Sequence, residues 1–332
     1  KSIILLSVIL LSGCQSVNPH IPLFIYDMKD PYMAIFAERI ESESEDLFVI
    51  DRFDATNSQI IQNEQIESTM SDQKVLLINP VDRLSVFSVI QKAQIEKNKL
   101  IFFNREPLNS DLNQYKDAYY VGADAKQSAQ LQAELIMDLF GSSTSLNHYD
   151  LNHDNIIQAV ILKGVQGHQD AEARTEYVVK TLQDEGYNIQ VLDIDISNWD
   201  VNEAKSATLN WFNTLEGIEL VISNNDAMAL GAIEALKELQ RFDDVDHDGK
   251  INRESAPWIP VVGIDGLDEA IQSITDGYLY GTIVNDSQSM AEVIIELANI
   301  LLNNGDLSSL SVPIVDGKYI WIDYQKLTLS NE

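Results

Sequence analysis

Three polar side chains of different kinds lie close together near the middle of the chain. Residues 164–174 come directly after the apolar run 159–162, which is typical of a buried strand. Two glycines allow a sharp turn that carries His168, and we expect a helix to begin near Asp170. Asp170 and Arg174 stand four residues apart, so they share one helix face. Open α/β sheets bind ligands at such strand ends, so the pattern indicates a polar ligand site, with a capped helix and an ordinary ion pair as the alternative.

Further polar side chains lie at or just past the ends of other apolar runs. They are Asp30, Asn104, Asn225, Asp265 and Asn285, with Tyr32 and Trp199 as flat aromatic surfaces. Taken singly, each Asn or Asp is more often a helix cap or a turn residue. Taken together, they suit a polyhydroxylated ring, because amides and carboxylates bond hydroxyls while aromatic rings cover apolar C–H faces.

The elements that must position these residues can be expected from the apolar runs. The first runs are 23–26, 47–50, 74–78 and 100–103, and after residue 122 the pattern starts again with 158–162, 189–192, 220–222, 260–264 and 281–284. Helical patterns separate them, and continuous apolar runs favour parallel sheets buried on both faces. We therefore predict an α/β fold with two Rossmann-like lobes. No Gly-x-Gly-x-x-Gly and no P-loop occurs, so nucleotide binding has no support.

Charge and length narrow the function further. The 332 residues are enough for two domains, and 52 acidic against 22 basic residues give a net charge of −30. Such a surface repels nucleic acid and anionic lipid, so a neutral or cationic ligand is the natural partner.

The first residues predict export and anchoring. A basic start, an apolar run too short to span a bilayer and small residues before the single cysteine, Cys14, describe an export signal. Residues 11–14 resemble a bacterial lipobox, which implies lipid attachment to Cys14; a plain signal or an apolar strand is the alternative. Because there is no initial Met, we expect the leader to start earlier. Residues 1–20 would then be signal and tether, leaving a soluble body held outside the cell.

Several stretches resemble the family of bacterial periplasmic galactose/glucose-binding proteins, which have the type I periplasmic binding protein fold. They are residues 102–107, 118–122, 167–175, 223–229 and 263–265, and the resemblance covers nearly all of the chain after residue 20. The family consists of two-lobed, hinged, non-enzymatic receptors that deliver hexose to an ABC permease and often to a chemoreceptor. The resemblance implies a monomer that binds glucose or galactose.

The resemblance also implies which residues contact the sugar. They are Asp30, Asn104, Arg105, His168, Asp170, Arg174, Asn225, Asp265 and Asn285, with Tyr32 and Trp199 sandwiching the ring. This chain departs from the family at two of them. Tyr32 stands where the family has Phe, which adds a hydroxyl near one ring edge. Arg105 replaces a Lys, and its planar guanidinium is not equivalent to a point charge.

Three chain crossings are implied between the lobes, near residues 122–124, 285–287 and 313–316. The N-terminal lobe would comprise 21–122 plus 286–314, and the C-terminal lobe 123–285 plus 315–332, with an acidic insertion at 241–258. Lobes hinged in this way should close on the ligand.

Two loops have the spacing of calcium ligands. Asp150, Asn152, Asp154 and Gln158 occupy oxygen positions of an EF-hand-like loop, with the carbonyl of Ile156 between them. The resemblance implies that Glu219 supplies the missing carboxylate, and the alternative is a polar turn. A second set, in the insertion, is Asp244, Asp246, Asp248, Lys250 and Asn252. This set is either a second calcium site or a solvated acidic turn.

Three function classes follow. The favoured one is an extracytoplasmic sugar-binding lipoprotein, held at the membrane by its lipid alone, that serves an ABC transporter. A sugar-sensing subunit of a membrane kinase is the first alternative. A glycoside hydrolase is the second, because Asp30, Asp170 and Asp265 could include an acid/base pair.

Overall fold

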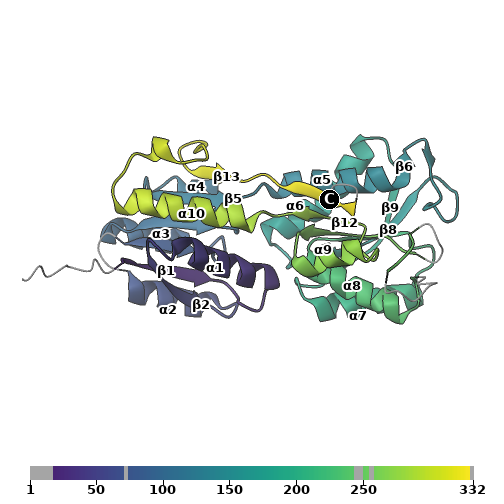
Figure 1. Cartoon of the computed structure of the whole chain (residues 1–332), viewed down its shortest axis with the longest axis horizontal. Helices are drawn as coiled ribbons and strands as arrows, with labels where there is room; N and C mark the ends of the chain where they lie inside the picture. Colours follow the sequence, from purple (N-terminus) through teal and green to yellow (C-terminus); the bar gives the residue numbers. More distant parts are fainter. Residues whose placement is uncertain (1–17, 71–73, 243–249, 254–257, 330–332) are drawn as a thin grey trace, which may run out of the picture.

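The computed structural model describes residues 18–70, 74–242, 250–253 and 258–329. These residues form two lobes placed end to end along the long axis of the molecule (Figure 1). Each lobe is built on a six-stranded sheet. Cys14 and most of the predicted signal lie outside the described residues. Within the described part, no helix combines the length and the apolar composition that a membrane span requires.

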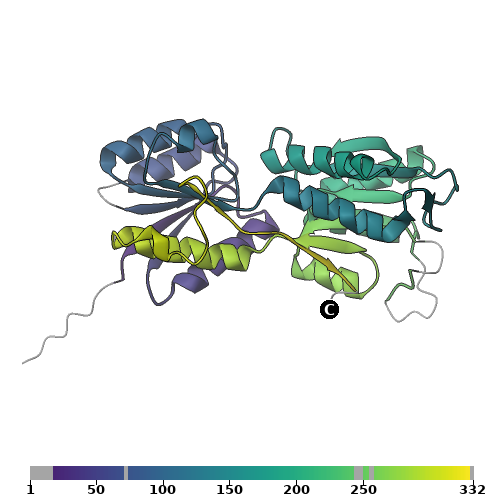
Figure 2. The ribbon, with the colours of Figure 1, turned by 90° about the horizontal axis from the view of Figure 1, so that it is seen from above.

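The first sheet is parallel throughout. In sheet order its strands are β13 (Tyr319–Trp321), β5 (Ala118–Gly122), β4 (Lys99–Phe103), β3 (Val75–Ile78), β1 (His20–Ile25) and β2 (Val49–Asp54). Helices α1 (Pro31–Ser44) and α10 (Ser287–Leu302) pack on one face, while α2 (Gln59–Thr69) and α3 (Phe87–Glu96) pack on the other (Figure 2). The short α4 (Asn109–Leu112) and η1 (Leu307–Ser309) complete this lobe.

The second sheet repeats this arrangement with one antiparallel edge strand. Its order is β14 (Gln325–Thr328), β12 (Gly281–Val284), β11 (Val261–Asp265), β10 (Leu220–Ser223), β8 (Ile157–Lys163) and β9 (Ile189–Ile196), with β14 antiparallel to β12. Helices α5 (Ala125–Phe140) and α6 (Gln169–Asp184) cover one face. The other face is covered by α7 (Val201–Thr214), α8 (Asp226–Glu238) and α9 (Asp268–Thr275). A small hairpin, β6 (Gly141–Ser142) with β7 (Ser145–Leu146), follows α5.

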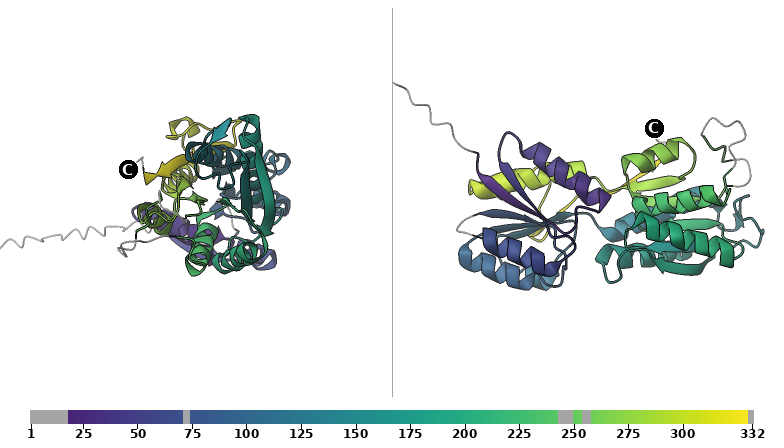
Figure 3. Two further views of the ribbon diagram at one scale, coloured as in Figure 1. Left: turned by 90° about the vertical axis from the view of Figure 1, so that its right-hand side faces the viewer. Right: turned by 90° about the horizontal axis from the view of Figure 1, so that it is seen from below.

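The sheets confirm the predicted α/β fold of two Rossmann-like lobes. Continuous burial explains why the prediction succeeds: every residue of β3, β5, β8, β10 and β11 is buried, as expected for parallel strands covered on both faces. Figure 3 shows the strands of the first sheet converging toward the second lobe, with thin connecting segments between the lobes.

The chain passes between the sheets three times. The first two passages follow β5 and β12, and the third lies at 322–324, between β13 and β14. The prediction placed the third passage near 313–316 and assigned 315–332 to the C-terminal lobe; this holds for β14 but is wrong for 319–321, which belong to the first sheet. Residues 319–321 pair with β5 instead, because Tyr319 and Trp321 pack their rings edge-on against Tyr120 in the first lobe.

Candidate functional site

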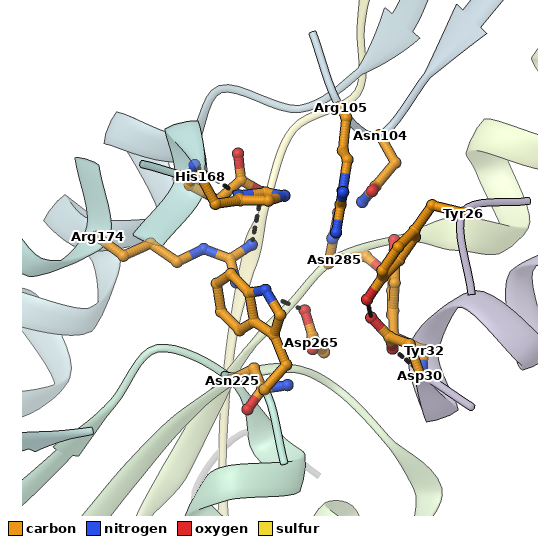
Figure 4. Close-up of a pocket in the computed structure, with 12 residues that line it drawn as sticks. Tyr26, Asp30, Tyr32, Asn104, Arg105, His168, Arg174, Asn225, Asp265 and Asn285 are labelled. Atoms are coloured by element: carbon orange, nitrogen blue, oxygen red, sulfur yellow. Dashed lines mark hydrogen bonds and ion pairs between the residues drawn. The ribbon is translucent and has the colours of Figure 1, made fainter. Parts of the chain in front are cut away.

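A small cavity lies between the lobes, beside the carboxyl ends of strands from both sheets. All eleven residues predicted to contact a sugar line it, and Tyr26 joins them. Figure 4 shows the labelled side chains arranged around this cavity from both lobes.

On the N-terminal lobe, Asp30 is both a helix cap and a wall of the cavity. Its Oδ1 accepts hydrogen bonds from the backbone N–H groups of Tyr32 (2.9 Å) and Met33 (3.3 Å) at the start of α1. Its Oδ2 accepts a 2.6 Å hydrogen bond from the hydroxyl of Tyr26. Burial raises the pKa of Asp30, and these three donors oppose that rise by stabilising the carboxylate. The carboxylate is thus held in one orientation before any ligand arrives.

Arg105 is fixed by an aromatic ring and a carbonyl. Its guanidinium carbon lies 3.5 Å from the centre of the Tyr26 ring, and Nη1 donates to the backbone carbonyl of Val81. The Nε of Arg105 is buried and has no partner. Its neighbour Asn104 has a left-handed backbone (φ 60°) and accepts a 3.1 Å hydrogen bond from Asn79 at its side-chain oxygen. The planar guanidinium therefore lies against Tyr26 in a way that a Lys ammonium could not reproduce.

On the C-terminal lobe, His168 caps α6 through its ring. Nδ1 accepts a 3.1 Å hydrogen bond from the backbone N–H of Asp170, so the ring proton is carried by Nε2. Burial, together with the positive charges of Arg105 and Arg174, holds the pKa of His168 well below its usual value. The ring is therefore a neutral donor at physiological pH.

Trp199 supplies a flat aromatic surface beside His168. The two ring centres are 5.2 Å apart with planes at 79°. Trp199 has a left-handed backbone (φ 67°), and its six-membered ring lies directly on Gly164. A Cβ at position 164 would come within 2.1 Å of that ring, so the first glycine of the motif is needed for close approach as well as for the turn.

Arg174 forms ion pairs with two carboxylates of the cavity. Its Nη2 lies 3.4 Å from Asp170 Oδ2, and its Nη1 lies 3.9 Å from Asp265 Oδ1. Nη1 also donates to the carbonyl of Asn224 (2.7 Å), and Nη2 to the hydroxyl of Tyr324 (3.1 Å). Burial raises the pKa of both Asp170 and Asp265, while the guanidinium opposes the rise. Three carboxylates thus share the cavity with two guanidinium groups.

The loop that carries Asp265 is fixed by hydrogen bonds to the side chain of Asp226. Asp226 is fully buried, and its Oδ2 accepts from the backbone N–H groups of Gly266 (2.7 Å) and Leu267 (3.0 Å). Its Oδ1 accepts from the Thr282 hydroxyl (2.6 Å). Asp265 itself has a positive φ of 133°, a conformation that such a clamp can maintain. Burial raises the pKa of Asp226 to about 6.

The remaining polar residues of the cavity are Asn225 at the start of α8 and Tyr32 and Asn285 beside the second crossing. Asn225 caps α8 by accepting from the backbone N–H of Met228 (3.0 Å). The Tyr32 hydroxyl donates to the backbone carbonyl of Asn285 (3.4 Å), so the group added in place of Phe is bonded to the hinge. Asn285 Oδ1 and Arg174 Nε are buried without partners. Buried polar atoms are normally paired, so these atoms indicate that a hydrogen-bonding ligand belongs here.

Sequence reasoning missed Tyr26. It placed Asp226 with Asn225 at a strand end but did not predict that Asp226 holds the loop of Asp265. Tyr26 ends an apolar run and was interpreted as part of the strand, although its spacing of four from Asp30 was a usable signal. Asp226 follows Asn225 directly and was indistinguishable from an ordinary first-turn acid.

The first predicted calcium loop has two buried acidic residues beside each other in space. Asp150 is 3% exposed and Glu219 is 1% exposed. Glu219 accepts from the backbone N–H groups of Leu151 (2.6 Å) and Gln158 (3.2 Å), so it is tied to the loop. Asp150 Oδ1 and Gln158 Oε1 are buried without partners. Within the described ranges, no three His, Cys, Asp or Glu side chains form a group that could hold a metal.

The second predicted calcium loop lies only partly within the described residues. Asp244, Asp246 and Asp248 lie outside the described residues, while Lys250 and Asn252 lie inside them.

Comparison with known proteins gives the class of the chain. Residues 21–306 match the model of the periplasmic binding protein domain. The chain is 36% identical over 293 residues to the D-galactose/methyl-galactoside binding periplasmic protein of Haemophilus influenzae, covering 87% of this chain and 83% of that protein. It is 26% identical over 280 residues to a putative rhizopine-binding protein of Rhizobium meliloti, covering 84% and 79%.

Solved structures share the fold. A solute-binding protein of Bacillus halodurans with bound myo-inositol superimposes with a TM-score of 0.75 at 23% identity, over 96% of this chain and 97% of that one. One from Actinobacillus succinogenes with bound D-allose gives 0.76 at 18%, over 94% and 98%. The chain therefore belongs to the periplasmic binding protein family, which confirms the predicted resemblance. It is a binding protein and not an enzyme, which rules against the hydrolase alternative.

Proposed function

We propose that the chain captures a neutral hexose, D-galactose or D-glucose, between its two lobes and releases it unchanged to an ABC permease. The observation that carries this proposal is the convergence of twelve residues from both lobes on one small cavity. Support for galactose comes from the relative that is 36% identical and is described as binding D-galactose and methyl-galactoside. The fold alone does not choose the sugar, because similar structures hold D-allose and myo-inositol.

The side chains divide into groups that suit a hydroxylated ring. The carboxylates of Asp30, Asp170 and Asp265 accept hydrogen bonds from hydroxyls. The guanidinium groups, the His168 Nε2–H and the amides donate to hydroxyl and ring oxygens. Trp199 and Tyr32 offer apolar surface to the C–H faces of the ring. Each carboxylate already accepts a hydrogen bond or lies beside a guanidinium. The site is therefore preorganised, and little conformational entropy is lost from its side chains when the ligand binds.

Calorimetry with D-galactose, D-glucose, D-allose, D-ribose and myo-inositol tests the proposal. We expect the first two sugars to bind most tightly and to be recovered intact by chromatography. If none of the five produces heat or a thermal shift, the proposal is wrong. If allose or myo-inositol binds best, the site is retained and the named hexoses are rejected.

We also propose that Ca²⁺ binds at the Asp150 loop. Buried, unpartnered Asp150 Oδ1 and Gln158 Oε1 fit this assignment, since Ca²⁺ accepts carboxylate, amide and carbonyl oxygens alike. The ligands would be Asp150, Asn152, Asp154, Gln158, Glu219 and the carbonyl of Ile156. The three carboxylates are not gathered into a metal-holding group in this structure, so the loop would have to rearrange around the buried acidic pair Asp150 and Glu219 to hold the ion. The Asp244 loop stays a candidate for a second ion.

Lipid attachment at Cys14 is part of the proposal, because the segment before it has the composition of a lipoprotein signal. Mass spectrometry of the N-terminal peptide from membrane fractions would detect the acyl groups. A chemoreceptor or a sensor kinase as an additional partner is likewise proposed, and receptor signalling in response to hexose would test it.

A further inference from the structure

Glu106 and Gln169 join the two lobes outside the sugar cavity. Gln169 Nε2 donates a 2.6 Å hydrogen bond to Glu106 Oε2. Glu106 follows β4 in the N-terminal lobe, and Gln169 is the first residue of α6 in the C-terminal lobe. Neither residue lines the cavity. In the part of the chain that the structure describes, we find no other side-chain hydrogen bond between the lobes away from the crossing segments.

Each partner is adjacent in sequence to residues of the cavity. Glu106 follows Arg105, and Gln169 stands between His168 and Asp170. The Glu106–Gln169 bond therefore forms only when the two walls of the cavity are brought to their positions in this structure. Formation of this bond depends on the relative position of the two lobes and not on which hydroxyl groups the sugar carries.

The surroundings of the bond fix Glu106 on its own lobe and leave the oxygen of the Gln169 amide unpaired. Arg83 Nε donates to the backbone carbonyl of Glu106, which fixes that residue on its own lobe. Gln169 Oε1 is buried and has no partner. Burial raises the pKa of Glu106; among neighbouring charges, Arg83 lowers it while Asp170 and Asp124 raise it further. An amide that donates to a partly buried carboxylate makes a charge-assisted hydrogen bond.

We propose that Glu106 and Gln169 form an interlobe latch that stabilises the closed state and so slows release of the bound sugar. This inference rests on the proposed function of the cavity. An interaction present only in the closed state increases the closed fraction, and the apparent dissociation constant falls in proportion. The latch acts through closure and does not touch the sugar, so these two are positioning residues.

The test measures sugar dissociation rate and affinity in the full chain by stopped-flow tryptophan fluorescence and calorimetry. Gln169→Ala removes the donor, and Gln169→Glu places a second carboxylate against Glu106. We expect release to accelerate about tenfold with Gln169→Ala, the size expected for a hydrogen bond to a charged group, and more with Gln169→Glu. The factor should be the same for hexoses and for their deoxy analogues.

Two variants separate the latch from a local defect in α6. Combining Gln169→Glu with Glu106→Gln exchanges the partners and should restore most of the slow release. Gln166→Ala alters the same loop within one lobe, where Gln166 contacts only Lys163 among its described hydrogen-bond partners, and should release sugar at the wild-type rate.

The outcomes are distinct. Wild-type protein that binds no sugar would reject the proposed function. Wild-type protein that binds sugar while Gln169→Ala and Gln169→Glu release it at unchanged rates would reject the latch alone. Faster release that the exchanged pair fails to restore would also reject the latch.

Discussion

The hydroxyl of Tyr26 donates a 2.6 Å hydrogen bond to Asp30, the same carboxylate that caps helix α1. The ring of Tyr26 simultaneously supports the guanidinium of Arg105. One tyrosine thus orients an acceptor and a donor of the cavity, on two different strand ends. Removing its hydroxyl changes the first interaction and leaves the second.

Tyr26→Phe should therefore weaken hexose binding by about 1 kcal/mol, the typical net value of one hydrogen bond. Calorimetry measures this change, and the melting temperature checks that the fold is intact. Tyr26→Ala, which also removes the surface under Arg105, should cost more. Equal affinities for the wild type and both variants would show that Asp30 and Arg105 need no support from Tyr26.

Trp199→Ala should weaken hexose binding by roughly 1–3 kcal/mol, because it strips apolar contact area from one face of the ring. Trp199→Phe keeps an aromatic surface and serves as the matched control, with a smaller loss expected. Calorimetry distinguishes the two. An affinity unchanged in Trp199→Ala would mean that this side chain only packs against Gly164 and His168.

Acidic sugars should be rejected. Three carboxylates share the cavity with two guanidinium groups, and two of them, Asp170 and Asp265, are buried, so a ligand carboxylate would add an uncompensated negative charge. We expect D-galacturonate to bind at least about a hundredfold more weakly than D-galactose, in line with the several-kcal/mol cost of an unpaired buried charge. Competition calorimetry measures the difference, and comparable affinities would contradict this account of the site.

Asp226→Asn should change how stability depends on pH. Burial raises the pKa of Asp226 from 3.8 to about 6, so on acidification the folded chain takes up this proton before the unfolded chain does. This group therefore makes the free energy of unfolding rise as pH falls from about 7 to about 4, by up to about 3 kcal/mol. Asn keeps an acceptor for the Gly266 and Leu267 N–H groups and can donate to Thr282. The free energy of unfolding of the Asp226→Asn variant should therefore lack this pH-dependent contribution.

Thermal melts of the wild type and Asp226→Asn at several pH values between 4 and 7.5 measure this difference. The variant should gain most over the wild type at the neutral end. Parallel curves would mean that Asp226 is ionised at the same pH in both states.

Chelation should lower the melting temperature if Ca²⁺ binds the Asp150 loop. Stabilisation by a ligand of the folded state is roughly 2.7 kcal/mol at a hundredfold excess over its dissociation constant. Glu219→Gln should reproduce much of the loss, while Asp246→Ala should remove one further equivalent of calcium with little change in melting. Metal analysis that finds no calcium in the wild type would reject both loops.

The sequence was most informative where burial is uniform. Strands such as β8 and β11 are buried along their whole length, and polar residues directly after them had to lie at the interface between lobes. The third crossing was misplaced because β13 has only three residues, and it pairs with a strand about 200 positions earlier. No local pattern encodes such a pairing. Tyr26 was missed for a related reason, since its position inside an apolar run conceals a polar role.

The order of synthesis has a consequence for how the first lobe matures. Helix α10 packs on α1, and β13 completes the edge beside β5, yet both are made after the whole second sheet except β14. At typical translation rates of about 5–20 residues per second, the intervening stretch of roughly 160 residues takes on the order of 10–30 s to emerge. During that interval α1 and its sheet lack the helix that carries Ile294 and Leu297 into the shared apolar core. The native core of the first lobe can therefore be completed only after residues 287–321 have been made.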